Sequence, residues 1–355
     1  MASRDITVLG AGVFGLAVAR ECLRRGAGVL VIDPKGPGGG ASGGVVGALA
    51  PHTPEGWTPF KAFQRDALLL ARTYWPEIET ASGLATGYRR SGRIQPLARE
   101  TDLERARARE KAAAELWQGA ATWSVTPDAP GWAPISPVGH WVEDTLSAQL
   151  DPARAVVALA QAIELEGGTI RREGEPQGVV IHATGWEGLR ALGADLGREM
   201  GGGVKGQAAI LDASPGEIPQ IYADGLHVVT HGPGRVAIGS TSEWDFQDPE
   251  ATDNALDDVV ARARAAVPFL KDAPVVARWA GVRPRAVKGR PLVGPWPGRA
   301  GHYVANGGFK IGFALAPALA PILADLVFDG VDRIPEEFRL GERAPMTQRP
   351  RGDFP

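Results

Sequence analysis

The sequence of 355 residues has a single cysteine, Cys22, and no excess of charge of either sign. One cysteine excludes an internal disulfide and any CxxC redox or zinc motif, which fits a reducing compartment. Lysine and arginine total 38 against 41 aspartates and glutamates, giving a net charge of −3. Because no block of like charge occurs either, we do not expect nucleic acid as a partner.

No apolar run is long and clean enough to predict a membrane span. Residues 312–328 are apolar, but two prolines and Asp325 interrupt them, and a span usually needs about 20 residues. Residues 6–19 resemble the core of a signal peptide, yet Asp5 precedes them and three glycines punctuate them. We therefore expect a cytoplasmic protein without a membrane span, and a buried helix near the C-terminus.

The chain is long and rich in glycine. The 47 glycines and 29 prolines are about a fifth of the residues, below the roughly 25–30% of disordered low-complexity chains. At a prior of roughly 150 residues per domain, the length suggests two globular domains. Helical patterns cover residues 60–82, 101–117, 151–166 and 254–266, and β-prone runs occupy 178–182, 206–241 and 302–305.

The N-terminus reads as a βαβ unit with a glycine-rich turn. A β-prone run at residues 6–9 leads into Gly10-Ala11-Gly12-Val13-Phe14-Gly15, a helical pattern to residue 25, and a second β run that ends on Asp33. In this fingerprint the glycines allow a tight turn, close approach of a pyrophosphate, and close packing of helix on strand. The helix N-terminus faces the phosphates, and Asp33 would bind a ribose diol. The alternative is an ordinary βα turn.

FAD and NAD share this fingerprint, and three later segments favour a flavin. GGGASGGVVGALAPHTPE resembles the loop that runs under the flavin in one group of flavoenzymes, although a flexible surface loop is the alternative. VVIHATG places small residues at the end of a strand. NGGFKIGFALAP is a glycine turn leading into a helix whose N-terminal dipole would stabilise negative charge on reduced flavin.

Together these segments resemble the D-amino-acid oxidase / glycine oxidase family of FAD enzymes, which includes sarcosine oxidase-like members. The resemblance runs from about residue 6 to 329 through ITVLGAGVFGLAVAREC, ASGGVVGALAP, VVIHATG, VKGQ, VAIGSTSE, WAGVRP, GRPLVGP and NGGFKIGFALAP. It implies an α/β fold (α+β in its two-domain layout), with a Rossmann-like FAD-binding domain and a substrate domain on an antiparallel sheet. We assign residues 1–85, 149–206 and 277–340 to the FAD-binding domain, 86–148 and 207–276 to the substrate domain, and 341–355 to a tail.

The resemblance also implies site residues. The arginine of the GxRP motif binds the substrate carboxylate in the family, and Arg283 occupies that position, where its two-pronged guanidinium suits a carboxylate. A surface or interdomain salt bridge is the alternative for Arg283. Lys310 lies in a GFK segment whose lysine helps to hold the carboxylate in sarcosine oxidase-like members, but it could equally lie at the flavin edge or reach water.

One position departs from the family. Glycine oxidase-like members carry a carboxylate-binding tyrosine where this chain has His227, whose imidazole is expected to titrate near neutral pH. His227 and His231 also suggest a metal pair, but residues four apart on a strand lie roughly 13 Å from each other, so no metal is expected. His52 and Glu55 are further candidates on the flavin loop, with a surface pair as the alternative.

The complete set of predicted site residues follows from these motifs. The catalytic candidates are Arg283, Lys310, His227 and His52. The cofactor-binding candidates are Gly10, Ala11, Gly12, Phe14, Gly15, Asp33, Pro34, Lys35, Ser42, Gly43, Gly44, Val46, Gly47, Ala183, Thr184, Gly185, Gly307, Gly308, Phe309, Lys310 and Ile311. The residue that contacts adenine is open, because the run between residues 168 and 179 is short for the family. FAD is expected to be non-covalent, since no cysteine lies near the C-terminal motif.

The prediction is an FAD-dependent oxidase or dehydrogenase that acts on a carboxylate-bearing amine: glycine, a D-amino acid or an N-substituted glycine. Its partners would be this small-molecule substrate and O2 or another electron acceptor, and a homo-oligomer is open. Two alternatives remain at this point. An NAD-dependent dehydrogenase would share the fingerprint but not the flavin-like loop, and a non-catalytic flavin-binding subunit would keep the cofactor motifs and lose the substrate contacts.

Overall fold

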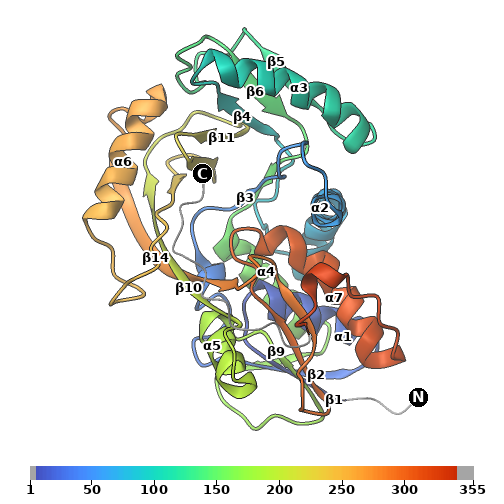
Figure 1. Ribbon diagram of the computed structural model, residues 1–355. Coiled ribbons are helices and arrows are strands. Elements are labelled where there is room, and N and C mark those ends of the chain that lie inside the picture. The colour runs from blue at the N-terminus through green and yellow to red at the C-terminus, as the bar shows by residue number, and fades with distance from the viewer. Residues whose placement is uncertain (1–4, 342–355) are drawn as a thin grey trace.

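The computed structural model describes residues 5–341, which form an α/β layer and a large, mostly antiparallel sheet (Figure 1). Residues 342–355, all but one of the predicted tail, lie outside the described residues. The two-domain α/β class expected from the sequence is the class observed.

The α/β layer is built on a six-stranded sheet. Its order is β15 (Leu292–Pro295), β16 (His302–Asn306), β9 (Val179–His182), β1 (Asp5–Leu9), β2 (Gly28–Ile32) and β8 (Thr169–Arg171). Every pairing is parallel except β15 with β16. The strands predicted at 6–9, 29–32, 178–182 and 302–305 are confirmed. The three-residue edge strand β8 was not predicted, because arginines at its end make it read as a loop.

Four helices pack against this sheet: α1 (Val13–Arg24), α4 (Pro152–Leu165), α5 (Gly185–Leu196) and α7 (Gly312–Asp329). Helix α2 (Pro59–Ser82) packs outside them, on α4 and α7. The Asp151 side chain accepts from the Arg154 N–H at 3.3 Å and Pro152 holds the first helical position, so α4 begins as the sequence predicts. α5 was missed, because its glycines lower helix propensity.

The apolar helix α7 meets the length and hydropathy criteria of a membrane span, but half of that stretch is buried inside the protein. It packs against α1 and α2, where Leu315, Leu319 and Leu323 are inaccessible or nearly so. This is the buried C-terminal helix expected from the sequence.

The second layer is an eight-stranded sheet. Its order is β14 (Val275–Ala286), β10 (Gly201–Leu211), β13 (Val236–Gly239), β12 (Leu226–Thr230), β11 (Gln220–Ala223), β4 (Arg93–Pro96), β6 (Trp141–Asp144) and β5 (Trp123–Thr126). All pairings are antiparallel except β11 with β4. The long strands β10 and β14 run across the boundaries drawn at residues 206 and 277, and the division into domains stays a prediction.

Two helices on the large sheet and several short segments complete the fold. Helix α6 (Asn254–Ala266) packs on β10, β12 and β13 through buried Leu256, Val259 and Val260, and α3 (Glu100–Leu116) packs on β5 at the other end of the sheet (Figure 1). The short segments are η1 (Ala41–Gly43), the two-stranded pair β3 (Ala48–Leu49) and β7 (Ala148–Gln149), η2 (Pro268–Leu270) and η3 (Glu336–Phe338). Contacts between η1 and β14 bring the glycine-rich loop to the large sheet.

Candidate active site at the junction of the two sheets

The turn between β1 and α1 admits only glycine at two positions. Gly10 has φ +106°, and a Cβ there would lie 2.3 Å from the Ala183 carbonyl oxygen. A Cβ on Gly15 would lie 1.9 Å from the Gly10 carbonyl oxygen. The backbone is therefore packed tightly under α1, as the fingerprint predicts.

The N-terminus of α1 is arranged to receive an anion. Its first turn has no acidic residue and no side-chain cap from Gly12, while the Val13 N–H donates to Ser42 Oγ at 3.0 Å. A Cβ on Gly12 would lie 3.1 Å from the same Ser42 Oγ, so a larger residue would fill the space in front of the helix. Free N–H groups and the helix dipole suit a pyrophosphate at this point.

Asp33 follows β2 with its carboxylate held in place. Oδ2 accepts from the Ala11 N–H at 2.7 Å and Oδ1 accepts from the Lys35 N–H at 2.9 Å. Each oxygen keeps a further lone pair, which suits a ribose diol. The Lys35 ammonium pairs with Glu250 at 2.5 Å on the exposed surface, and Pro34 beside it is exposed too.

The glycine-rich loop continues the cradle from α1 to the large sheet. A Cβ on Gly43 would lie 2.2 Å from the Gly38 carbonyl oxygen, and one on Gly44 would lie 3.3 Å from the Trp279 ring. Further on, a Cβ on Gly47 would lie 1.9 Å from the Leu150 carbonyl oxygen, and the Val46 side chain faces Gly239. Ser42, Gly43, Gly44, Val46 and Gly47 therefore line one backbone path between the layers.

Two further turns converge on the same place. After β9, Ala183 is buried against Gly10, Thr184 stands at the N-cap position of α5 without a side-chain capping bond, and the Gly185 carbonyl accepts from Asn306 Nδ2 at 2.8 Å. After β16 come Gly307, Gly308, Phe309, Lys310 and Ile311, and a Cβ on Gly308 would lie 2.4 Å from the Phe14 ring. This contact joins the fingerprint helix to the C-terminal motif, as a shared cofactor site requires.

The N-terminus of α7 also lacks an anionic or capping side chain. Ile311 precedes it without a side-chain hydrogen bond, and its first turn has no acidic residue. Its dipole is thus uncompensated, so the turn fits a group that acquires negative charge.

Cys22 is buried in α1, where desolvation raises the pKa of its thiol to about 12.

Arg283 projects from β14 with its guanidinium held in a fixed orientation. Nη1 donates to Ser240 Oγ at 2.6 Å, and Nη2 donates to the carbonyl oxygens of Lys205 at 3.1 Å and Thr241 at 2.7 Å. Nε is buried and has no hydrogen-bond partner among residues 5–341. Desolvation lowers the pKa of Arg283 to about 10, so the group stays charged at neutral pH with an N–H left to bind a ligand.

Lys310 and His227 join Arg283. The Lys310 ammonium and the Arg283 guanidinium lie 5.6 Å and 5.7 Å from the centroid of the Phe309 ring. Desolvation, followed by the charge of Arg283, lowers the pKa of Lys310 below its ordinary value. The charge of Lys310 also lowers the pKa of His227. The structure therefore brings three of the four catalytic candidates together, namely Arg283, Lys310 and His227.

The expectation that His227 titrates near neutral pH is wrong. Desolvation, followed by the charges of Arg93 and Lys310, lowers the pKa of the imidazole to about 3. Its Nδ1 is buried and has no hydrogen-bond partner among the described residues, while its ring lies 4.7 Å from that of Tyr222. His227 is therefore a neutral hydrogen-bonding group at working pH.

His52, the fourth catalytic candidate, is engaged with α2. Its backbone N–H donates to Gln64 Oε1 at 2.9 Å, its Nδ1 contacts the same oxygen, and its ring packs edge-on against Phe60 at 5.4 Å. Glu55 pairs with Arg109 of α3 and not with His52. Between residues 5 and 341, no hydrogen bond or ring contact joins His52 to Arg283.

His231, the other member of the predicted histidine pair, follows β12 and contacts the Val45 carbonyl oxygen through Nε2 at 2.7 Å. His227 instead faces Tyr222 and Gly239 in the sheet. In the described part of the chain, no three histidine, cysteine or acidic side chains lie together as a metal would need.

Sequence reasoning missed several residues at this site. Ser240 and Thr241 hold Arg283, and Tyr222 covers His227; the strand register that places them is not visible in any one segment. Near the ribose site, the Arg172 guanidinium would lie 3.9 Å from a Cβ on Gly36. Arginine after a short edge strand was the one signal that could have drawn attention to that position.

Comparison with known proteins agrees with this geometry. The profile of the family described as FAD dependent oxidoreductase (DAO) matches residues 5–326. Glycine oxidase of Pseudomonas aeruginosa is 29% identical over 87% of this chain and 91% of its own length. Glycine oxidase of Pseudomonas putida is 36% identical, although that match spans only 38% of this chain and 37% of the relative.

The fold is also that of a solved relative. The crystal structure of glycine oxidase from Geobacillus kaustophilus superposes with a TM-score of 0.83 at 22% identity, over 97% of this chain and 100% of that one. The profile match covers most of the chain, and the turns around Gly12 and Gly308 fit the cofactor. The protein therefore belongs to the DAO family of FAD-dependent oxidoreductases, is an enzyme, and uses FAD rather than NAD.

Proposed function

We propose that the protein oxidises an amine that bears a carboxylate, namely glycine, a D-amino acid or an N-substituted glycine, to the corresponding imine. The observation that carries the proposal is the orientation of Arg283, whose buried Nε has no hydrogen-bond partner among the described residues. Fixed by Ser240 and two carbonyl oxygens, this guanidinium can bind a carboxylate without reorganising.

The neighbouring side chains support the same assignment. Lys310 adds a second cation beside Phe309, and the neutral His227 offers Nδ1 as a hydrogen-bonding group. Two neighbouring cations repel each other, so the charge of Arg283 adds to desolvation in lowering the pKa of Lys310. A substrate carboxylate between them would relieve that repulsion.

FAD supplies the electron acceptor when it is held by the α1 turn, Asp33, the Ser42 loop and the α7 N-terminus. The substrate would lose a hydride to FAD from the carbon next to its neutral amine, the nitrogen lone pair would form the C=N bond, and the resulting iminium would release its N–H proton to water to give the imine. Arg283 would orient that C–H bond by fixing the carboxylate. Water then hydrolyses the released imine to a carbonyl compound and an amine, and O2 or another acceptor takes the two electrons.

An anaerobic panel of amines tests the reaction class. Glycine, N-methylglycine, several D-amino acids and the matching amines without a carboxylate are added to the purified yellow protein, and bleaching of the flavin bands is followed. We expect bleaching by at least one carboxylate-bearing amine and by none of the carboxylate-free amines. Bleaching by carboxylate-free amines alone would contradict the proposal.

Arg283→Ala tests the carboxylate contact itself. Removing one partner of a charge-assisted pair in a partly dry site costs about 2–5 kcal/mol, so kcat/KM should fall roughly 30-fold or more while flavin content is retained. Arg283→Lys should recover only part of the loss, because an ammonium lacks the planar fork. The control is the amine without a carboxylate, which Arg283→Ala should oxidise no worse than wild type. Equal damage to both substrates would place Arg283 in a structural role.

A further inference from the structure

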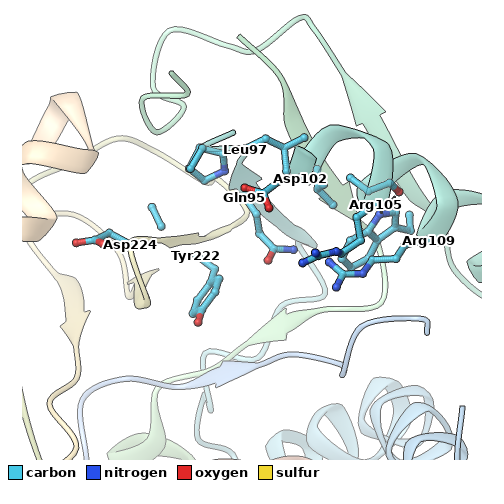
Figure 2. A pocket seen from close by; sticks show the side chains of 13 residues that line it. Gln95, Leu97, Asp102, Arg105, Arg109, Tyr222 and Asp224 are labelled. Carbon is cyan, nitrogen blue, oxygen red and sulfur yellow. Dashed lines mark hydrogen bonds between the residues drawn. The ribbon is translucent and has the colours of Figure 1, made fainter. Parts of the chain in front are cut away.

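A cavity of about 210 Å³ lies between α3 and the large sheet, beyond the site just described. Figure 2 shows that Arg105 and Arg109 extend from α3 into the space that Gln95 and Tyr222 face from the sheet. Buried Trp123 and Val142 close its inner wall. The cavity thus combines apolar lining residues with a few polar and charged side chains, which is the usual composition of a small-molecule site.

Tyr222 lies between this cavity and His227. It lies directly opposite His227 in the β11–β12 register, so both side chains project from the same face of the sheet. Their ring centroids are 4.7 Å apart, and Tyr222 also lines the cavity. Arg283, His227 and Tyr222 therefore lie on one face of the sheet, and the cavity with the arginines of α3 begins at Tyr222.

The carboxylates around the cavity are already paired. Asp102 bonds Arg99 at 3.0 Å, Asp224 bonds Arg262 at 2.6 Å, and Glu55 reaches Arg109 from the loop before α2. Each of these carboxylates is already engaged by an arginine, and at Asp102 the charge of Arg105 adds to that of Arg99.

The arginines of α3 keep unused N–H groups. Arg105 is an exposed side chain that lines the cavity near the charge of Asp102, and among the described residues it makes no hydrogen bond or ion pair. Arg109 bonds Glu55 through Nη2, but its Nε is buried and lacks a partner in the described part of the chain. A buried guanidinium N–H without an acceptor is costly, and an anion in the cavity would remove that cost.

We propose that the substrate carries a second carboxylate, at the far end of its side chain or N-substituent, and that Arg105 and Arg109 bind it. The inference rests on the proposed function, because Arg283 must hold the first carboxylate for the second to reach α3 past Tyr222. It narrows the substrate class to elongated amino dicarboxylates. The amine oxidised is the one next to the carboxylate at Arg283, and the second carboxylate takes no part in the chemistry.

The experiment compares matched substrates. N-(carboxyalkyl)glycines with spacers of increasing length are set against N-alkylglycines of equal chain length, and kcat/KM is measured for each. We expect one spacer length at which the dicarboxylate exceeds its neutral partner about tenfold, the size of a partly exposed charge-assisted contact. Wild type that oxidises both series equally at every length overturns the second carboxylate and leaves the proposed function standing.

Variants on α3 test whether Arg105 and Arg109 cause the preference for the dicarboxylate. Arg105→Gln and Arg109→Gln should each remove most of the dicarboxylate advantage and leave kcat/KM for N-alkylglycines unchanged within about twofold. Arg107→Gln is the control, since Arg107 is exposed on the same helix and does not line the cavity. An advantage that survives both cavity variants, or is lost equally in Arg107→Gln, would contradict the assignment to this cavity.

A binding measurement separates the two proposals. A straight-chain alkanedicarboxylate of the length favoured in the substrate series and the alkanoate of equal chain length are titrated into the FAD-loaded protein, and the change in the flavin spectrum gives each dissociation constant. We expect the dicarboxylate to bind more tightly in wild type and to lose that preference in Arg105→Gln, whatever the turnover. Loss of binding of both acids only in Arg283→Ala, with no preference in wild type, would support the carboxylate site at Arg283 and overturn the one at α3.

Discussion

The cofactor side and the proposed substrate side of the site are built differently. On the cofactor side, backbone turns at residues 10–15, 42–47, 183–185 and 307–308 pack against each other at glycines. On the proposed substrate side, charged or polar side chains project from β14, β12 and β11, and the proposed second carboxylate site adds those of α3. A site formed by backbone turns is encoded by short local sequence motifs. A site formed by side chains depends instead on which strands are neighbours in the sheet.

Both sides nevertheless depend on a glycine for space. Gly12 keeps the α1 N-terminus open in front of Ser42. Gly206 on β10 keeps room for the guanidinium of Arg283, since a Cβ there would lie 2.2 Å from Nη1. Replacing each glycine should therefore damage one side and spare the other, which tests whether the two sides are separable.

Gly12→Val should have the largest effect. The new side chain fills the place of the pyrophosphate, so we expect folded protein that has lost almost all its flavin. Flavin absorbance per protein and far-ultraviolet circular dichroism check the two parts. Gly40→Val is the control, because a Cβ on Gly40 meets no atom within 4 Å. A fully yellow Gly12→Val protein would show that FAD does not use this turn.

Gly206→Ala should have an intermediate effect confined to the substrate side. The methyl group must push away the guanidinium, a flexible side-chain end, so the fold and the flavin survive while kcat/KM for the carboxylate-bearing amine falls roughly tenfold or more. Gly202→Ala on the same strand has open space at the Cβ position and serves as the control. A loss of flavin in Gly206→Ala would mean that the two sides are not separable.

The same contrast explains how far the sequence could predict the structure. The βαβ unit and the α7 turn were predicted because glycine spacing is local, and Arg283 because its motif resembles a known family. Ser240 and Arg109 were not predicted, because each becomes significant only through a partner more than forty residues away. Tyr222 was not predicted, because its place opposite His227 depends on the register of the β11–β12 hairpin. The neutral state of His227 could not be predicted either, since desolvation in the folded sheet lowers its pKa.

His227 gives the smallest predicted effect, on stability and not on the cofactor. Its pKa is about 3 in the folded chain against an ordinary 6.5, so between these values the unfolded chain binds the extra proton. Stability should therefore fall as the pH falls from about 6.5 towards 3, and His227→Gln, which has no such group, should lose less.

We expect the Tm of FAD-saturated wild type to fall a few degrees further than that of His227→Gln between about pH 7 and about pH 4.5. His140→Gln is the control, because that ring is only half-buried near the Val138 carbonyl oxygen. Parallel loss of stability in wild type and His227→Gln would show that the imidazole is protonated in the folded protein, and would return it to the set of groups that titrate with activity.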